Sequence, residues 1–262
     1  MVDEAQLTKG AIGTLERGLA ILQHFKSVPE ATIVDVANAL GLSRSTTYRI
    51  AERLRELGFL EIVDKTARWR LGQETVQLGV AALQSTDIMR VAPDLLQHLL
   101  AEVKEAVNLA VFDVDSMVLV YRDQGPQSVT VSSRLGARRP MHASAVGKAY
   151  LAAMENEERE ALIERLDLKR FTPNTIVDPS ALKREIEAIQ QRGFAMDLRE
   201  FEPSLACTAS AVFDHRAVPV AAISASGLAE RVMPHIDQIG NRVAATARAI
   251  SERLGYIRTR AR

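Results

Sequence analysis

Residues 32–60, TIVDVANALGLSRSTTYRIAERLRELGFL, contain the pattern of two short helices joined by a turn. Val36 and Leu40 lie one helical turn apart, and Gly41 then ends the first helix. Ser43 is a favoured N-cap residue, because its hydroxyl accepts a hydrogen bond from a free N–H group of the following helix. The stretch therefore predicts a helix-turn-helix.

The second helix of this pair is expected to have two unlike faces. The apolar face should pack in a core and holds Tyr48, Ile50, Ala51, Leu54 and Leu57. The polar face should be open to solvent and holds Arg44, Ser45, Thr46, Thr47, Arg49 and Arg53. Hydroxyl side chains in the first turn, with arginines around them, are typical of a helix whose N-terminal end enters the major groove of DNA. The pattern therefore predicts DNA binding.

A short hairpin is predicted directly after the second helix. Residues 59–71 alternate like two strands around a brief turn. Arg68 and Arg70 share one face of the returning strand, whereas Trp69 lies on the other face and is expected to pack inside. Such a hairpin completes a winged helix-turn-helix.

The side chains expected at DNA fall into two groups. Candidates for contacts with base edges are Arg44, Ser45, Thr46, Thr47 and Arg49. Candidates for phosphate contacts, which position a domain without reading sequence, are Arg53, Lys65, Arg68 and Arg70. Arg55 is expected to pair with neighbouring glutamates on a solvated face. The alternative is a helix-turn-helix that makes only protein contacts.

Composition limits the remaining possibilities. Lys+Arg and Asp+Glu are equal at 33 each over the whole chain. Between Ser43 and Arg70, however, there are seven basic and four acidic residues, so this segment has an excess of positive charge where phosphates would lie. A single cysteine excludes an internal disulfide and a cysteine-rich metal cluster. Without an apolar leader or a run of about 20 apolar residues, we expect a cytoplasmic protein with no membrane partner and no cofactor.

At 262 residues the chain is long enough for more than one domain. We expect a disordered leader at 1–10, a winged helix-turn-helix domain at 11–73, a linker helix at 74–91 and a larger domain at 92–262. In the larger domain, strands and helices mix without strict βαβ alternation, which favours an α+β fold built on an antiparallel sheet. Its expected strands include Ser128–Leu135 and a hairpin over Cys207–Ser226.

The larger domain also contains a candidate anion site. Residues 138–149, RRPMHASAVGKA, open a helix with small residues, and the free N–H groups at a helix N-terminus can hold a carboxylate. An ordinary tight turn before a helix is the alternative. Asp197, Cys207, Ser224 and Ser226 lie on strands farther along, and the two serines share one face of their strand.

The chain from about Gly13 to Leu254 resembles the IclR family of bacterial transcription regulators. The motifs are GTLERGLAIL, GLSRSTTYRIAERLRELGFL, PMHASAVGKAYLA, GFAMD, EFEPSLACTASAVFD and AAISASG, in that order. The resemblance implies a C-terminal effector-binding domain of GAF-like fold, with a small organic acid bound over its sheet. It implies a ligand-responsive regulator of a catabolic operon, either a repressor, which we expect, or an activator. Its DNA partner would be a palindromic operator, bound by a homodimer or a dimer of dimers.

The resemblance also implies which residues form the effector site. The backbone N–H groups of Ala145 and Val146 would hold the carboxylate. The polar lining would be Asp197, Cys207, Ser224 and Ser226, and the apolar wall Val131, Met141 and Leu205. Arg139 stands where an aliphatic residue is common in the family. We expect its side chain to point outward; an inward side chain could pair with a second carboxylate.

Two other functions can be stated from the residues. Cys207 as nucleophile with His142 as base would make an enzyme acting on a small carboxylate, although cysteine chemistry needs a lowered pKa and a partnered base. A metal-dependent sensor would need a metal-binding spacing of His, Cys, Asp or Glu, and none of the known spacings occurs. The sequence therefore favours a regulator over an enzyme.

Overall fold

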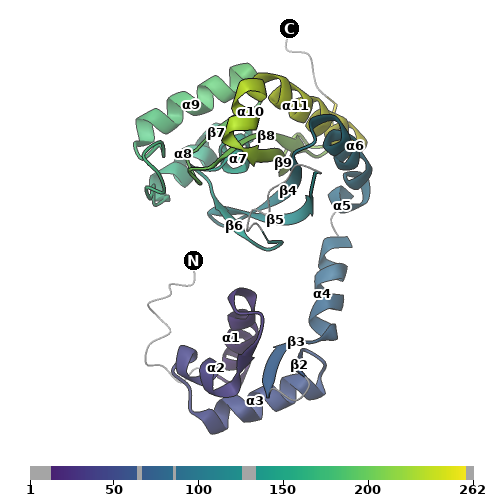
Figure 1. Ribbon diagram of the computed structural model, residues 1–262, viewed down its shortest axis with the longest axis vertical. Helices are drawn as coiled ribbons and strands as arrows, with labels where there is room; N and C mark the ends of the chain where they lie inside the picture. Colours follow the sequence, from purple (N-terminus) through teal and green to yellow (C-terminus); the bar gives the residue numbers. More distant parts are fainter. Residues whose placement is uncertain (1–12, 64–66, 85–86, 126–133, 258–262) are drawn as a thin grey trace. The chain divides into compact units, whose positions relative to one another are not determined.

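The computed structural model describes residues 13–63, 67–84, 87–125 and 134–257 (Figure 1). Its chain divides into two compact units, Met1–Thr86 and Asp87–Arg262. The division falls inside the segment expected as a linker, which forms two helices, α4 (Gln73–Gln84) and α5 (Asp87–Val91). Among the described residues, no helix is long and apolar enough to cross a membrane.

The first unit is the expected winged helix-turn-helix. Before α4 its elements are α1 (Thr14–Ser27), β1 (Ala31–Thr32), α2 (Ile33–Leu40), α3 (Arg44–Glu56), β2 (Leu60–Val63) and β3 (Arg68–Leu71). The strands form a small antiparallel sheet in the order β1-β3-β2. Its core joins all three helices to the wing through Ile21, Phe25, Val36, Ile50 and Trp69.

Local capping explains where α2 and α3 begin and end. The Thr32 hydroxyl accepts a hydrogen bond from the Asp35 N–H, and the Asp35 carboxylate accepts one from the Thr32 N–H, which makes a capping box at the start of α2. Gly41 ends α2 with a φ of 64°, a left-handed conformation that favours glycine. Ser43 caps α3 by accepting from the Thr46 N–H at 3.2 Å, as its position predicts.

The expected faces of α3 are wrong by one residue near its start. Thr47 is fully buried, and its hydroxyl donates to the Ser43 carbonyl at 3.0 Å, so it is not open to DNA. Tyr48 is instead 54% exposed and lies edge-on to Trp69, and Leu57 is also exposed. Thr47 and Ala51 are one turn apart on the buried stripe. A threonine can occupy that stripe because the backbone of the preceding turn satisfies its hydroxyl.

The second unit is an α+β domain on a six-stranded antiparallel sheet of order β6-β5-β4-β9-β8-β7. Its strands are β4 (Ala106–Asp113), β5 (Ser116–Asp123), β6 (Arg138–Pro140), β7 (Ala195–Leu198), β8 (Leu205–Phe213) and β9 (Pro219–Leu228). Its helices after α5 are α6 (Pro93–Val103), α7 (Ala145–Ala153), α8 (Asn156–Arg165), α9 (Pro179–Arg192), α10 (Ala229–Val232) and α11 (Ile236–Arg253), with a 3-10 turn at Met233–His235.

Most of one strand expected in this unit, Ser128–Leu135, lies outside the described residues. Of the segment Ser128–Leu135, residues 128–133 lie outside the described part of the chain, and residues 134–135 belong to a loop and turn. The edge strand is β6, which pairs with β5 so that Arg139 lies opposite Met117. β6 was not predicted because three residues are too few for an alternating pattern.

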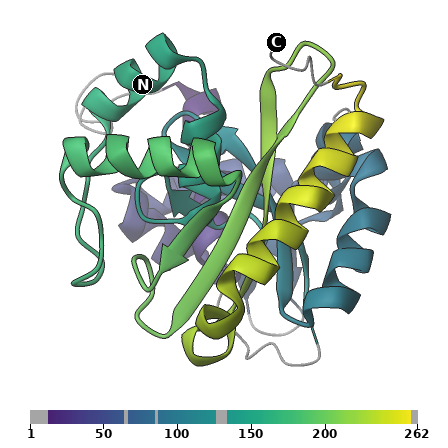
Figure 2. The ribbon, with the colours of Figure 1, turned by 90° about the horizontal axis from the view of Figure 1, so that it is seen from above.

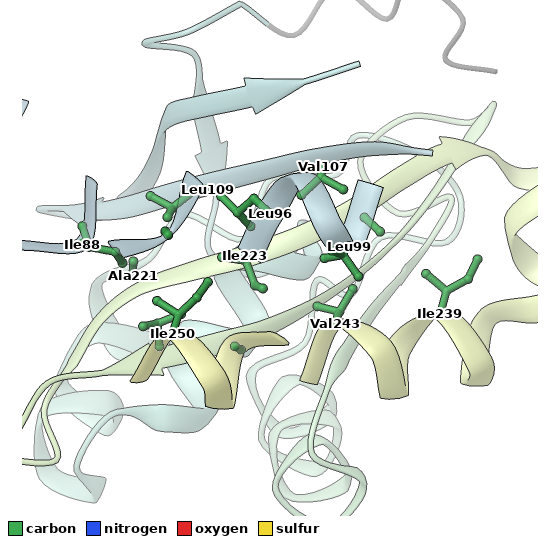
Figure 3. Close-up of a cluster of buried hydrophobic side chains, with 14 of the residues drawn as sticks. Ile88, Leu96, Leu99, Val107, Leu109, Ala221, Ile223, Ile239, Val243 and Ile250 are labelled. Carbon is green, nitrogen blue, oxygen red and sulfur yellow. The ribbon is translucent and has the colours of Figure 1, made fainter. Parts of the chain in front are cut away.

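The two faces of the sheet are covered by different helices. Figure 2 shows α11 and α6 side by side on one face, where Leu96, Leu99, Ile223, Val243 and Ile250 form a continuous core (Figure 3). The helices α7 to α9 cover the other face through a second core. The sheet contributes alanines to this second core, which are Ala110, Ala195, Ala209 and Ala222. Because these side chains are small, α7 packs close to the sheet.

Candidate effector site and DNA-facing surface

The start of α3 presents unshielded positive charge. Arg44, Ser45 and Arg49 are exposed, and Thr46 is partly exposed. Within the described residues, neither Arg44 nor Arg49 has an ion-pair partner. Farther along the helix the arginines form exposed ion pairs: Arg53 pairs with Glu56 at 2.7 Å, and Arg55 pairs with Glu52 at 2.8 Å, as expected for Arg55.

The wing continues this charged surface. Arg68 and Arg70 are exposed on β3, while Trp69 between them is buried in the core, as its alternation predicts. Arg70 is held by Glu61 on β2 at 2.6 Å. Lys65, the remaining candidate for a phosphate contact, lies outside the described residues.

A small cavity of about 50 Å³ lies in the second unit, between the start of α7 and the sheet. Seven of the nine residues expected at the effector site line it: Ala145, Val146, Asp197, Leu205, Cys207, Ser224 and Ser226. Met141 does not; it is buried in the apolar core against α7. Val131 lies outside the described residues. Further lining residues, which the sequence did not indicate, are Asn108, Leu119, Ser144, Phe201 and Glu202.

Strand pairing gathers the polar floor of the cavity. Asp197 on β7 lies opposite Cys207 on β8, which lies opposite Ser226 on β9. On β4, Asn108 lies opposite Ser224 and its Nδ2 donates to the hydroxyls of Ser224 and Ser226 at 3.2 and 3.1 Å. The Asn108 Oδ1 is buried and has no hydrogen-bond partner among the described residues. A single amide at the start of an apolar strand was the available signal for Asn108.

The N-terminus of α7 forms the opposite wall. The Ser144 hydroxyl accepts from the Gly147 N–H at 3.1 Å, and the Lys148 N–H donates to the Ser144 carbonyl at 3.0 Å. The N–H groups of Ala145 and Val146 precede the first intrahelical hydrogen bond, and both residues line the cavity. The wall therefore offers two donors and the positive end of a helix dipole.

Gly147 fixes where this helix begins. A Cβ atom at residue 147 would lie 2.5 Å from the Cα of Met141 and 2.6 Å from the carbonyl oxygen of Pro140. Only a glycine allows α7 to pack this closely against the end of β6. The first turn of α7 and the strand that carries Arg139 are thus held together by backbone contact.

Burial dominates the electrostatics of the cavity. Asp197 is 4% exposed, and burial raises its pKa to about 7, although the Glu200 N–H donates to its Oδ1 at 2.7 Å. Lys148, only 1% exposed, pairs with Glu200 at 2.5 Å. Burial also raises the pKa of Glu200, and the Lys148 charge opposes that shift. This ion pair joins α7 to the turn after β7, next to Asp197.

The outward orientation expected for Arg139 is wrong. Its side chain lines the cavity, and its guanidinium carbon lies 5.1 Å from the centre of the Phe201 ring. Burial lowers the pKa of Arg139, while the charge of Glu202 opposes this shift. An aromatic face stabilises an inward guanidinium, and sequence spacing does not reveal that contact.

The geometry gives no support to cysteine catalysis. Burial raises the pKa of Cys207 well above its ordinary value, so the nucleophilic thiolate is disfavoured. His142 is buried outside the cavity lining, and its Nε2 lies 2.9 Å from the carbonyl oxygen of Lys169. In the described ranges, no three His, Cys, Asp or Glu residues are grouped closely enough to hold a metal.

A winged helix-turn-helix joined to a domain with a small polar cavity defines the class of ligand-responsive DNA-binding regulators. Two family descriptions match the chain: the IclR helix-turn-helix domain over residues 14–63, and the C-terminal domain of the bacterial transcriptional regulator IclR over residues 80–252. The chain belongs to the IclR family. It is a DNA-binding transcriptional regulator with a C-terminal effector domain.

Similar proteins span nearly the whole chain. The HTH-type transcriptional repressor AllR of Klebsiella pneumoniae is 36% identical over 255 residues, covering 96% of this chain and 93% of that protein. The transcriptional repressor IclR of Escherichia coli (strain K12) is 30% identical over 253 residues, covering 95% and 92%.

Solved structures of similar chains share the fold. The Thermotoga maritima IclR is 32% identical with a TM-score of 0.79, covering 93% of this chain and 99% of that one. An IclR homolog from Microbacterium hydrocarbonoxydans, in complex with 4-hydroxybenzoate, is 25% identical with a TM-score of 0.82, covering 92% and 99%.

Proposed function

We propose that this protein is a repressor whose affinity for operator DNA is set by a small organic acid bound in the cavity of its C-terminal domain. The observation that carries the proposal is the position of the cavity, between two N–H donors of α7 and a polar strip of the sheet. The alternative is a transcriptional activator of the same architecture. Relatives that are named as repressors favour repression.

The acid would be held at both walls of the cavity. Its carboxylate accepts hydrogen bonds from the Ala145 and Val146 N–H groups. Its other polar atoms meet Asn108, Asp197 and Ser226 on the floor, while Leu205 packs against its carbon atoms. The 4-hydroxybenzoate bound by the Microbacterium homolog is also a carboxylic acid. The cavity is small, about 50 Å³, which favours a short acid over a larger one here.

The DNA-facing residues follow from exposure on α3 and the wing. Arg44, Ser45, Thr46 and Arg49 are proposed to contact base edges in the major groove. Arg53, Lys65, Arg68 and Arg70 are proposed to contact phosphates. Thr47 is not proposed to contact DNA, because its side chain is buried. We also propose a cytoplasmic location, because that is where a regulator of bacterial transcription meets chromosomal DNA.

An exposed apolar groove on the first unit supports a homodimer. It is lined by α1 and α3, and its members Leu15 and Leu19 on α1 are 72% and 50% exposed. A two-fold symmetric dimer, alone or paired into a dimer of dimers, would read a palindromic operator.

Two measurements test the proposal. DNA enriched by the protein from a random-sequence pool should contain a palindromic site, and titration at fixed salt should show that an acid weakens binding to that site. A melting-temperature screen should identify this acid among short carboxylic acids. At 100 times its dissociation constant, an acid raises the melting temperature by about 5–11 °C.

Matched variants locate the binding. Ser226→Ala should reduce the melting shift, whereas Ser210→Ala should not, because Ser210 lies on β8 outside the cavity lining and bonds the Gly193 carbonyl. A screen in which no acid stabilises the protein would reject the small-acid proposal. Enriched DNA without any common site would reject specific operator binding.

A further inference from the structure

Arg139 places a permanent positive charge inside the cavity. It is the middle residue of the edge strand β6, and its side chain shares the cavity with Ala145 and Val146 at the start of α7. A guanidinium stays protonated at neutral pH even when burial lowers its pKa. The cavity therefore has two features that attract anions: the donors of α7 and the side chain of Arg139.

Two acidic side chains lie near Arg139 in the lining of the cavity. Asp197 has a pKa of about 7, so near neutral pH it is only partly ionised. Glu202 is the other carboxylate in the lining. A second guanidinium, that of Arg122 on the neighbouring strand β5, lies close enough for the Arg139 charge to lower its pKa. Two guanidiniums and the carboxylate of Glu202 thus act on one another near this end of the cavity.

The geometry of Arg139 suits a ligand group. The guanidinium carbon lies 5.1 Å from the centre of the Phe201 ring, and its Nη1 donates to the Arg138 carbonyl at 3.3 Å, so two contacts restrain the group. A guanidinium held in one orientation can donate two parallel hydrogen bonds to a carboxylate. The adjacent Arg138 is different: it is exposed and pairs with Asp113 at 2.6 Å.

We propose that the effector is a short dicarboxylic acid, with one carboxylate at the N–H groups of Ala145 and Val146 and the second at the guanidinium of Arg139. This inference rests on the proposed function, and it specifies the chemical class of the effector. Arg139 is then a specificity-determining residue, which separates dicarboxylic acids from acids with a single carboxylate.

The experiment compares acids of equal size that differ by one charge. Malonate is paired with malonamate, and succinate with succinamate, so that only one carboxylate becomes an amide. Calorimetric titration of the full-length protein at pH 7 gives the affinity ratio of each pair. We expect the better-fitting diacid to bind roughly 10- to 100-fold more tightly than its half-amide, the range for hydrogen bonds to a charged group.

Variants assign the preference to one side chain. Arg139→Leu should bring the diacid and half-amide affinities to within a few-fold of each other, and Arg138→Leu should leave their ratio unchanged. If Arg139→Leu does not fold, Arg139→Gln keeps a polar side chain of similar length and should show the same loss. A purely structural role for Arg139 would change the melting temperature and leave the affinity ratio intact.

The outcomes separate this inference from the proposed function. If half-amides or other monoacids bind as tightly as diacids, and Ser226→Ala still weakens them, the dicarboxylate inference is wrong and the small-acid site stands. If the wild-type ratio survives Arg139→Leu and Arg139→Gln, Arg139 is not the second carboxylate site. If no acid binds, the proposed function fails together with the inference.

Discussion

The arginines of α3 and the arginine of the cavity occupy opposite environments. Arg44 and Arg49 are exposed, and in the described part of the chain neither has an ion-pair partner. Arg139 is enclosed against Phe201 and close to two acids of the cavity lining. An exposed charge has a small desolvation free energy, and it acts through contacts with a large partner. Buried charge is expensive to desolvate, so it persists where a fixed partner or a ligand compensates it.

The comparison is tested most strongly at the buried pair Lys148 and Glu200. Lys148→Met should lower the free energy of unfolding by about 3–5 kcal/mol, because Glu200 is left buried without its cation. Chemical denaturation at pH 7 measures this loss. The loss should shrink at lower pH, since protonation removes the unpaired charge of Glu200.

A double variant shows whether the loss comes from the charge. Lys148→Met with Glu200→Gln leaves no buried charge at either position and should recover most of the stability. Equal instability of the single and double variants would mean that packing around Lys148, and not its ion pair, is what matters.

The exposed arginines should have smaller effects, confined to DNA. Arg44→Ala and Arg49→Ala should each weaken binding to the enriched site by about 1–3 kcal/mol, the value of a good base contact, without changing the melting temperature. Arg70→Ala should weaken binding to all sequences alike and reduce the salt dependence by about one ion, as loss of a phosphate contact does. Titrations at several salt concentrations separate these two patterns.

Arg55→Ala is the matched control on the same helix, because Arg55 is outside the set of residues proposed to contact DNA. Its affinity for the enriched site should equal that of the wild type. Wild-type affinity in Arg44→Ala, Arg49→Ala and Arg70→Ala together would contradict the DNA-facing surface proposed for α3 and the wing.

The smallest expected effect is a pH dependence of acid binding. Burial raises the pKa of Asp197 from 3.8 to about 7, so the side chain is neutral below that pH and charged above it. A bound carboxylate repels the ionised form and favours the protonated form. Affinity should therefore be flat below about pH 7 and fall above it, by about tenfold in total if binding raises the pKa of Asp197 by one unit, which is about 1.4 kcal/mol.

Calorimetric titration from pH 6 to 9 checks this dependence. Asp197→Asn cannot ionise and should remove the fall above pH 7. A fall that persists in Asp197→Asn would assign the titration to another group of the cavity.

The two domains also differ in how far the sequence could predict them. In the first unit the signals are local: Ser43, Gly41 and the alternation around Trp69 each act within a few residues, so α2, α3 and the wing were predicted. Which of Thr47 and Tyr48 faces the core was not predicted, because neighbouring helix positions differ by only about 100° and either residue can be half-buried. Tertiary packing decides between them.

In the second unit the chemistry depends on strand pairing. Asp197, Cys207 and Ser226 become neighbours only through the register of β7, β8 and β9. Their assignment to one site came from the family resemblance and not from spacing. The inward turn of Arg139 depends on its contact with Phe201, sixty-two positions away in the sequence. No periodic pattern contains such a contact.

Gly147 sets the distance between the two walls of the cavity in the effector domain. Since no side chain fits between the start of α7 and the end of β6 at residue 147, we expect the span from the Ala145 N–H to the strand bearing Arg139 to stay the same when Arg139 or Leu205 is exchanged. Replacing Arg139 or Leu205 should therefore change which chemical group is accepted at the far end, while the accepted ligand length stays the same. The domain is for this reason a suitable scaffold for engineered biosensors. In such variants the side chains of one wall are changed, and the distance between the two binding sites is kept.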